Sequence, residues 1–293
     1  MTIKERVDRI SDKSDISIDM LPTTCKIEIC GMCSFDCEFC YHRVMKANGE
    51  RQSLMSYDNF IKVLNEIDTL KSIKEIGLFY MGESGMHPLL DVFYKELKNR
   101  GYFTYLTANG SYTKNIIKAL PYIDSLKISW NYKNEDDYYK KTNSNIPYET
   151  IIANITLLYN ECKRLNKEFT ISTILDTTKD DYKDILKTLP YDEHYWLPLQ
   201  SQNGTINGVG GVVGQYDNQA FPLPCWSLFK GLYIDVDLNI RCCCYGHYKE
   251  HIIGSLLDKP LLDIIKSDKL VKMKYQHLND TIPPECLKCI DGE

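Results

Sequence analysis

The chain has 293 residues, of which 43% are hydrophobic and 26% charged, as in ordinary globular proteins, so wholesale disorder is excluded. Its net charge of −5 and its scattered lysines disfavour a nucleic-acid partner. Neither a run of about 18 apolar residues nor a signal-like segment is present, so the sequence predicts no membrane partner and a cytoplasmic location.

Strand and helix patterns alternate through the first two thirds of the chain. Apolar runs typical of buried strands cover residues 26–30, 76–80, 103–107, 126–130, 169–174 and 195–199. Helical spacing lies between them, at residues 57–69, 89–99, 114–120, 148–165 and 181–189. About six β/α units of this kind predict an α/β fold with a helix-covered parallel sheet, a partial (β/α)6 TIM-like barrel. Ligands of such folds bind at the carboxyl ends of the strands.

The alternation stops at a glycine-rich segment, residues 200–214, which we interpret as a linker or gating loop. Beyond it, residues 232–236 and 239–241 are typical of a β-hairpin, and residues 261–276 have the spacing of an amphipathic helix. The sequence therefore predicts four parts, which are an N-terminal lead at 1–23, the barrel at 24–203, the linker at 204–224 and a small α+β unit at 225–293.

Cysteine is the one unusual component, with 12 residues that fall partly into clusters. In a reducing compartment, clustered thiols bind metals more often than they form disulfides. Cys33, Cys37 and Cys40 have the spacing C-x3-C-x2-C, and three thiolates on one loop can hold three irons of a cubane cluster and leave the fourth open. Addition of Cys30 would give a four-thiolate zinc site, which is the alternative from local sequence. Because Cys30 ends a predicted strand, we expect it to pack as a small buried hydrophobic residue.

This cysteine loop, the β/α units that follow it and a Gly82-Glu83 pair after the second strand resemble the radical S-adenosylmethionine (SAM) superfamily. The resemblance implies that the three cysteines bind a [4Fe–4S] cluster whose open iron is chelated by SAM. An electron from an external donor such as flavodoxin or ferredoxin would cleave SAM to a 5′-deoxyadenosyl radical. That radical would remove a hydrogen atom from the substrate.

The resemblance also assigns residues to SAM binding. The segment Met81-Gly82-Glu83-Ser84 matches the family motif that meets the SAM amino group, although Met81 stands where the family often has glycine. Ser129 ends the fourth strand, where a hydroxyl commonly meets the SAM ribose or carboxylate, and Tyr41 directly follows the cysteine loop. For Asn109, which precedes Gly110 in a frequent family turn, we expect a role in the turn rather than in ligand binding.

A second group of cysteines lies in the C-terminal unit, namely Cys225, the run Cys242-Cys243-Cys244, and the pair Cys286 and Cys289. Their order around the predicted hairpin and helix resembles the twitch form of the SPASM auxiliary-cluster domain. This resemblance implies a second [4Fe–4S] cluster held by Cys225, Cys243, Cys286 and Cys289, and the chain ends before the cysteines of a further cluster. Cys242 or Cys244 is an alternative ligand, and zinc an alternative occupant. Alternation along the hairpin would place Cys242 and Cys244 opposite Cys243. Cys25 and Cys162 are expected to serve packing.

An auxiliary cluster with four protein ligands has no open iron, so we expect it to move electrons rather than bind substrate. Two reactions follow, dehydrogenation with that cluster as electron acceptor, or epimerisation with Cys242 or Cys244 as hydrogen donor. Because the lead before the first motif is short, we expect a small polar metabolite (a sugar, aminocyclitol or nucleotide derivative), bound near Trp196, Gln200, Gln202 and Asn203. A peptide-modifying maturase or epimerase is the alternative enzyme, and a non-catalytic zinc-binding interaction protein is the alternative of another class.

Overall fold

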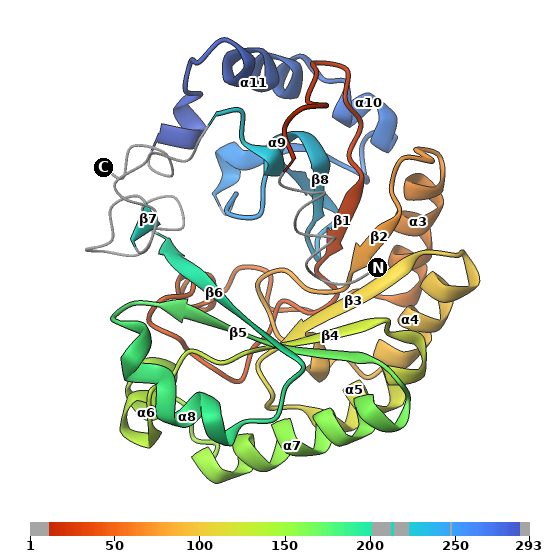
Figure 1. Ribbon diagram of the computed structural model, residues 1–293. Helices are drawn as coiled ribbons and strands as arrows, with labels where there is room; N and C mark the ends of the chain where they lie inside the picture. Colours follow the sequence, from red (N-terminus) through yellow and green to blue (C-terminus); the bar gives the residue numbers. More distant parts are fainter. Residues whose placement is uncertain (1–11, 201–211, 214–222, 247, 288–293) are drawn as a thin grey trace.

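The computed structural model describes residues 12–200, 212–213, 223–246 and 248–287. Six consecutive strands pair in parallel around a curved sheet (Figure 1). They are β1 (Thr24–Ile27), β2 (Glu75–Gly77), β3 (Phe103–Ala108), β4 (Ser125–Ser129), β5 (Glu168–Leu175) and β6 (Glu193–Gln200). A short strand, β7 (Val212–Val213), pairs antiparallel with β6.

Helices connect the parallel strands and cover the outside of the sheet (Figure 1). They are α2 (His42–Ala47), α3 (Tyr57–Asp68), α4 (Leu90–Asn99), α5 (Thr113–Ala119), α6 (Glu135–Thr142), α7 (Tyr148–Arg164) and α8 (Lys183–Thr188). The predicted partial (β/α)6 barrel is confirmed, and α2 and α6 are additions that periodicity alone did not predict. None of the helices in the described ranges has both the length and the apolar character that crossing a membrane requires.

The two faces of the barrel sheet differ in polarity because side chains alternate along each strand. On β1, Cys25 and Ile27 are fully buried in the same apolar cluster as Phe60 and Leu64 of α3. Lys26 projects from the opposite, inner face and is only half-buried. Across the other strands the helix side is likewise fully buried and apolar, at Ile76, Leu106, Leu126, Ile128, Phe169 and Ile171. The apolar face packs against the helices, which leaves the inner face available for polar groups.

The C-terminal unit extends this same sheet. It consists of α9 (Trp226–Lys230), β8 (Gly231–Ile234), β9 (Asn239–Arg241), β10 (Ile252–Ser255), α10 (Leu261–Ile265) and α11 (Asp268–Leu278). β8 pairs in parallel with β1, and β9 and β10 continue antiparallel, so the predicted hairpin is confirmed as the edge of the barrel sheet. The single helix predicted at 261–276 is two helices, because Ser267 has extended backbone angles and begins α11 as its cap.

β1 ends at Ile27, earlier than predicted, because the next residues pair with other segments. The amide of Glu28 donates to the carbonyl of Ile234 at 2.8 Å, and the carbonyl of Ile29 accepts from the amide of Met55 at 2.8 Å. After β1 the chain therefore leaves the sheet at the place where the barrel meets the C-terminal unit. The cysteine loop begins there.

Candidate active site and cluster sites

The first cysteine loop lies beyond the carboxyl end of β1, as barrel folds require of a site. Cys33, Cys37 and Cys40 are half-buried, and burial raises the pKa of all three thiols. The amide of Phe35 and the side-chain amide of Asn109 each approach the Cys33 Sγ at 3.5 Å. Such N–H groups suit a sulfur that carries negative charge as a cluster ligand.

No three His, Cys, Asp or Glu side chains of the described segments are placed to hold one metal ion. The thiolates of a four-iron cluster each bind a different iron, so that cluster does not require its ligands to meet at a single point. Cys30 is 1% exposed, and its thiol donates to the carbonyl of Met32 at 3.5 Å. The expectation that Cys30 packs as a buried residue is confirmed, as it is for the fully buried Cys25 and Cys162.

The segment after β2 packs directly on the cysteine loop. The amide of Glu83 donates to the carbonyl of Met32 at 2.7 Å. A Cβ on Gly82 would lie 2.1 Å from the carbonyl oxygen of Cys30 and 2.7 Å from that of Met32, so only glycine fits this approach. The requirement for glycine at position 82 is therefore set by contact with the backbone of the cysteine loop.

Glu83 carries a buried carboxyl group that is 3% exposed. Its two oxygens accept from the amide of Gly85 at 2.9 Å and from the amide of Asn109 at 2.7 Å. Burial raises the pKa of Glu83 to about 7, and these two amides partly oppose that rise. The neighbouring Ser84 hydroxyl is buried without a partner among the described residues. A carboxylate and a hydroxyl at this point fit a ligand with an ammonium group, as the SAM amino group requires.

Asn109 forms the turn that the sequence predicts and also makes contacts outside that turn. Gly110 has φ +82°, as expected for the turn, and the Asn109 side-chain oxygen accepts from the amide of Ser111 at 2.9 Å. Together with its contacts to Glu83 and Cys33, this makes Asn109 a direct link between the SAM-motif segment and the cysteine loop. The Asn-Gly pair was a visible signal, but a turn explains such a pair without any ligand.

Ser129 and Tyr41 lie in different surroundings. Ser129 is half-buried at the end of β4 and is in register with Ser172 of β5, whose hydroxyl is buried without a partner among the described residues. Ser172 is an addition to the candidate site that nothing in the sequence distinguished. Tyr41 is 2% exposed, and its ring packs edge to face on Tyr248 of the C-terminal unit at 5.7 Å.

Trp196 does not lie on the inner face of the barrel, although the sequence predicted it to lie near the substrate. Its ring centroid lies 5.7 Å from that of Tyr182, on the helix side of β6. The alternating side chains of that strand place Glu193 and Tyr195 on the inner face instead. The side chain of Gln200, and residues Gln202 and Asn203, lie outside the described residues.

His251 connects two segments of the second cysteine set. His251 is 1% exposed, its Nδ1 accepts from the amide of Tyr248 at 3.1 Å, and its Nε2 lies 3.1 Å from the carbonyl of Glu285. The acceptor role of Nδ1 assigns the ring proton to Nε2. The backbone carbonyl of His251 also accepts from the amide of Cys242 at 3.0 Å. His251 therefore joins the turn that contains Cys243 to the 3-10 turn Pro284–Cys286, two predicted ligand segments separated by about forty positions.

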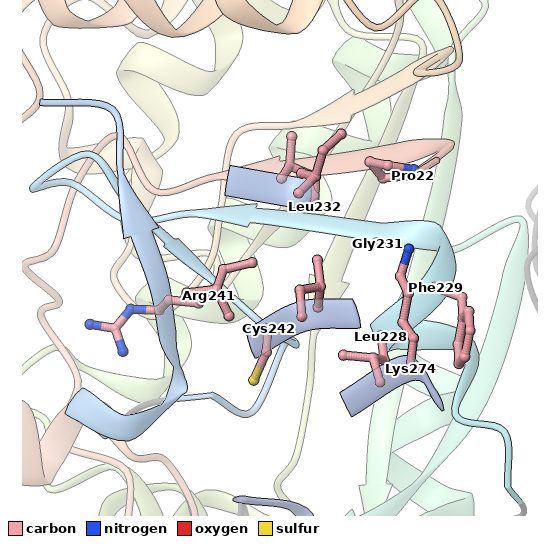
Figure 2. A pocket seen from close by; sticks show the side chains of 11 residues that line it. Pro22, Leu228, Phe229, Gly231, Leu232, Arg241, Cys242 and Lys274 are labelled. Carbon is pink, nitrogen blue, oxygen red and sulfur yellow. The ribbon is translucent and has the colours of Figure 1, made fainter. Parts of the chain in front are cut away.

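The three adjacent cysteines differ in burial, although the thiols of Cys242 and Cys243 are in contact. Cys242 is 3% exposed and, with Leu228, lines a mainly apolar pocket of only about 10 Å³ that also includes Arg241 and Lys274 (Figure 2). Cys243 and Cys244 are half-buried, and the Ser227 hydroxyl lies 3.6 Å from the Cys244 Sγ. β9 ends before this run, so strand alternation does not apply and the expected common face for Cys242 and Cys244 is wrong.

Cys225, Cys243 and Cys244 lie close together. Burial and the two neighbouring thiols raise the pKa of Cys225 to about 12. Cys225 is also the cap of α9, and its amide donates to Nδ1 of His277 at 3.2 Å. This grouping is consistent with Cys225 and either Cys243 or Cys244 as ligands to one cluster. Cys289, the fourth predicted ligand, lies outside the described residues.

Tyr80 connects the two cysteine sites. It directly precedes the Met81–Ser84 segment, and its hydroxyl donates to the carbonyl of Cys243 at 3.0 Å. Its ring lies 6.0 Å from that of Tyr233 on β8. The residue directly before the segment predicted to bind SAM is therefore in contact with the turn predicted to bind the auxiliary cluster.

We expect Gly82→Ala to lower the free energy of unfolding by about 2–3 kcal/mol, because the new methyl group must displace backbone of the cysteine loop. Urea unfolding would measure this, and iron analysis should show loss of the cluster held by that loop. Gly101→Ala is the control, since Gly101 has φ +81° and nothing lies within 4 Å of the place that a methyl group would take. That control should cost about 1 kcal/mol and leave iron binding intact. Equal iron binding in both variants would contradict the packing role of Gly82.

Comparison with known proteins agrees with this geometry. The family model of the radical SAM superfamily matches residues 27–189, and that of an iron–sulfur cluster-binding domain, SPASM, matches residues 225–290. The chain is 28% identical over 95 residues to a tungsten-containing aldehyde ferredoxin oxidoreductase cofactor-modifying protein of Pyrococcus furiosus, which covers 32% of this chain and 26% of that protein. It is 28% identical over 175 residues to 7-carboxy-7-deazaguanine synthase of Methanocaldococcus jannaschii, which covers 54% of this chain and 66% of the synthase. The matches thus span less than two thirds of either relative.

Solved structures share the fold at low identity. BtrN in complex with AdoMet and 2-DOIA has a TM-score of 0.58 at 13% identity and covers 88% of each chain. SuiB of Streptococcus suis bound to precursor peptide SuiA has a TM-score of 0.59 at 13% identity and covers 98% of this chain and 73% of SuiB. Because the first family match takes in more than half of its residues, the chain belongs to the radical SAM superfamily, whose cofactors are SAM and a [4Fe–4S] cluster, and it carries a second iron–sulfur cluster-binding domain at its C-terminal end.

Proposed function

We propose that this protein oxidises a small polar metabolite by radical SAM chemistry, with Cys33, Cys37 and Cys40 as ligands of the SAM-binding cluster. Cys225, Cys243, Cys286 and Cys289 would hold the auxiliary cluster. The observation that carries the proposal is the hydrogen bond from Tyr80 to the Cys243 carbonyl, next to the segment proposed to bind SAM. A direct contact of this kind suits an auxiliary cluster that accepts an electron from chemistry at the SAM site.

In the proposed oxidation, the bound cluster and SAM together supply the electron and the radical that take a hydrogen atom from a substrate carbon. The hydroxyl or amine on that carbon would lose a proton, and a cluster held by Cys225, Cys243, Cys286 and Cys289 would supply an acceptor for the remaining electron, so that a C=O or C=N bond would form. Glu83 would hold the SAM ammonium, with Ser84 as a further hydrogen-bond partner. Gly82 would keep this segment against the cysteine loop.

The polarity of the inner sheet face supports a small polar substrate. Half-buried groups on that face include Lys26, Tyr105, Thr107, Lys127 and Ser129. A sugar, aminocyclitol or nucleotide derivative offers hydroxyl and charged groups that such side chains can bind. A peptide is the alternative substrate.

Epimerisation is the second candidate reaction, with Cys244 as hydrogen donor. Cys244 is half-buried and close to the other cluster thiols, whereas Cys242 packs in the apolar core. If Cys243 is the cluster ligand, Cys244 is a free thiol at the edge of the site.

We expect the anaerobically reconstituted protein to bind about eight iron atoms, four for each cluster. Cys33→Ala should lower this to about four and abolish 5′-deoxyadenosine formation, whereas Cys243→Ala should also leave about four but retain SAM cleavage. Cys162→Ala, which removes a fully buried thiol of α7, is the matched control that should keep the full iron content. Stoichiometric zinc without iron would contradict the enzyme proposal in favour of a zinc-binding interaction protein.

Affinity for SAM should rise between pH 6 and 7.5, because the pKa of Glu83 near 7 leaves its carboxyl largely neutral at the lower pH and a carboxylate attracts the ammonium. The stability of the protein without SAM should change in the opposite direction as the pH rises. The folded protein holds this proton to higher pH than the unfolded chain, so the free energy of unfolding should fall as pH rises from 4.5 through 7.

Equilibrium titration with SAM would measure this pH dependence. Glu83→Gln should weaken SAM binding at pH 7.5 by about tenfold and remove the pH dependence. Glu149→Gln, a change at an exposed position of α7, is the control. A Glu83→Gln profile that follows the wild type would rule out this role for the carboxyl group.

Turnover in deuterated water would separate the two reactions. Oxidation predicts a product that has lost two hydrogens and carries no deuterium on the reacting carbon. Epimerisation predicts one deuterium at an inverted centre, and Cys244→Ala should then prevent its incorporation. A product of the second kind would overturn the proposed oxidation.

A further inference from the structure

Lys26 occupies the inner face of the sheet between the two strands that lead to the cluster sites. It is in register with Gly77 of β2 on one side and with Tyr233 of β8 on the other. β2 leads into the Met81–Ser84 segment, and β8 leads through the hairpin to Cys243. A group bound by Lys26 would thus lie beside both strands.

Aromatic rings frame the Lys26 side chain. Its ammonium nitrogen lies 5.3 Å from the ring centroid of Phe79 and 5.7 Å from that of Tyr233. Phe79 in turn packs edge to face on Tyr105 at 5.4 Å. These contacts hold the alkyl chain and orient the charge, but they leave the three N–H donors of the ammonium for other partners.

Two glycines make this arrangement possible. A Cβ on Gly77 would lie 2.6 Å from the Phe79 ring and 2.8 Å from the Tyr105 ring, and a Cβ on Gly231 would lie 2.3 Å from the Tyr233 hydroxyl. The rings therefore lie across the glycines, close to the sheet, rather than projecting toward the centre of the barrel. Glycine within a strand often marks such a close approach.

Two carboxylates that directly follow β1 and β8, Glu28 and Asp235, are each paired with an arginine. Glu28 pairs with Arg51 at 3.2 Å and Asp235 with Arg241 at 2.7 Å, and within the part of the chain that the structure describes no carboxylate forms an ion pair with Lys26. A half-buried ammonium without a counter-ion is well suited to bind an anion, because the charge-assisted hydrogen bond forms in a partly desolvated setting.

We propose that Lys26 binds an anionic group of the substrate, a phosphate or a carboxylate, on the inner face of the barrel. The identification of the bound molecule as the substrate rests on the proposed function, but anion binding at Lys26 does not. The substrate would then be an acidic small molecule, such as a sugar phosphate or a sugar acid, rather than a neutral one.

Binding to the SAM-loaded holoenzyme at constant ionic strength tests this inference. Inorganic phosphate is the first probe, followed by two matched pairs, ribose 5-phosphate with ribose and glucuronate with glucose. We expect at least one anion to bind about tenfold more tightly than its neutral counterpart, and the preferred pair distinguishes a phosphate site from a carboxylate site. Calorimetric titration supplies the dissociation constants.

Lys26→Met should abolish the preference for the anion, because methionine keeps the apolar contact with the rings but has no charge. Lys26→Arg should retain it, and Lys95→Met, at an exposed position of α4, should leave it unchanged. An unchanged preference in Lys26→Met, or failure of all three anions to bind the wild type, would overturn the proposal. SAM cleavage measured on the same samples reports separately on the proposed function, since anion binding requires no turnover.

Discussion

Glu28 brings together four separate segments through one completely buried carboxylate. Its oxygens accept from the Arg51 guanidinium, from the amide of Met81 and from the amide of Val236, each at 3.2 Å. A buried carboxylate is tolerated only when its charge is paired and its lone pairs are used, and removal of one partner from such a pair typically costs about 3–5 kcal/mol. The strand that leads into the cysteine loop, the SAM-motif segment and the hairpin of the C-terminal unit are thus held to one point.

A second buried pair extends this constraint to the auxiliary site. Asp235 is fully buried and accepts from Nε of Arg241 at 2.7 Å, and Arg241 also donates to the carbonyl of Gly246 at 2.9 Å. Gly246 closes the turn that begins at Cys243. Tyr80 and His251 then connect that turn to the SAM-motif segment and to the Cys286 turn. Because these contacts are made by buried polar groups with defined geometry, the distance between the two cysteine sites is fixed by hydrogen bonds rather than by apolar packing alone.

The elements and the first cysteine site were predictable because their signals are local. Alternation of strand and helix predicted the barrel, and the spacing of Cys33, Cys37 and Cys40 predicted a ligand loop, which the structure places beyond the carboxyl end of β1. The contacts that organise the site join distant positions and leave no local pattern. Glu28 and Arg51 are 23 residues apart, and Tyr80 is 163 residues from Cys243. The environment of Cys242 was predicted wrongly for a related reason, since alternation holds only while a strand continues and β9 ends at Arg241.

The same alternation, where it does hold, explains how one strand can serve both stability and binding. On β1 the outward residues Cys25 and Ile27 are fully buried against the helices, so the position between them must face the interior of the barrel. A lysine there cannot reach solvent on the helix side, and the rings of Phe79 and Tyr233 restrict where its ammonium can go. Since Glu28 and Asp235 are already neutralised by their arginines, the positive charge of Lys26 is not cancelled by either of them. The two buried pairs therefore connect the two cysteine sites without involving Lys26, whose charge stays on the inner face of the barrel.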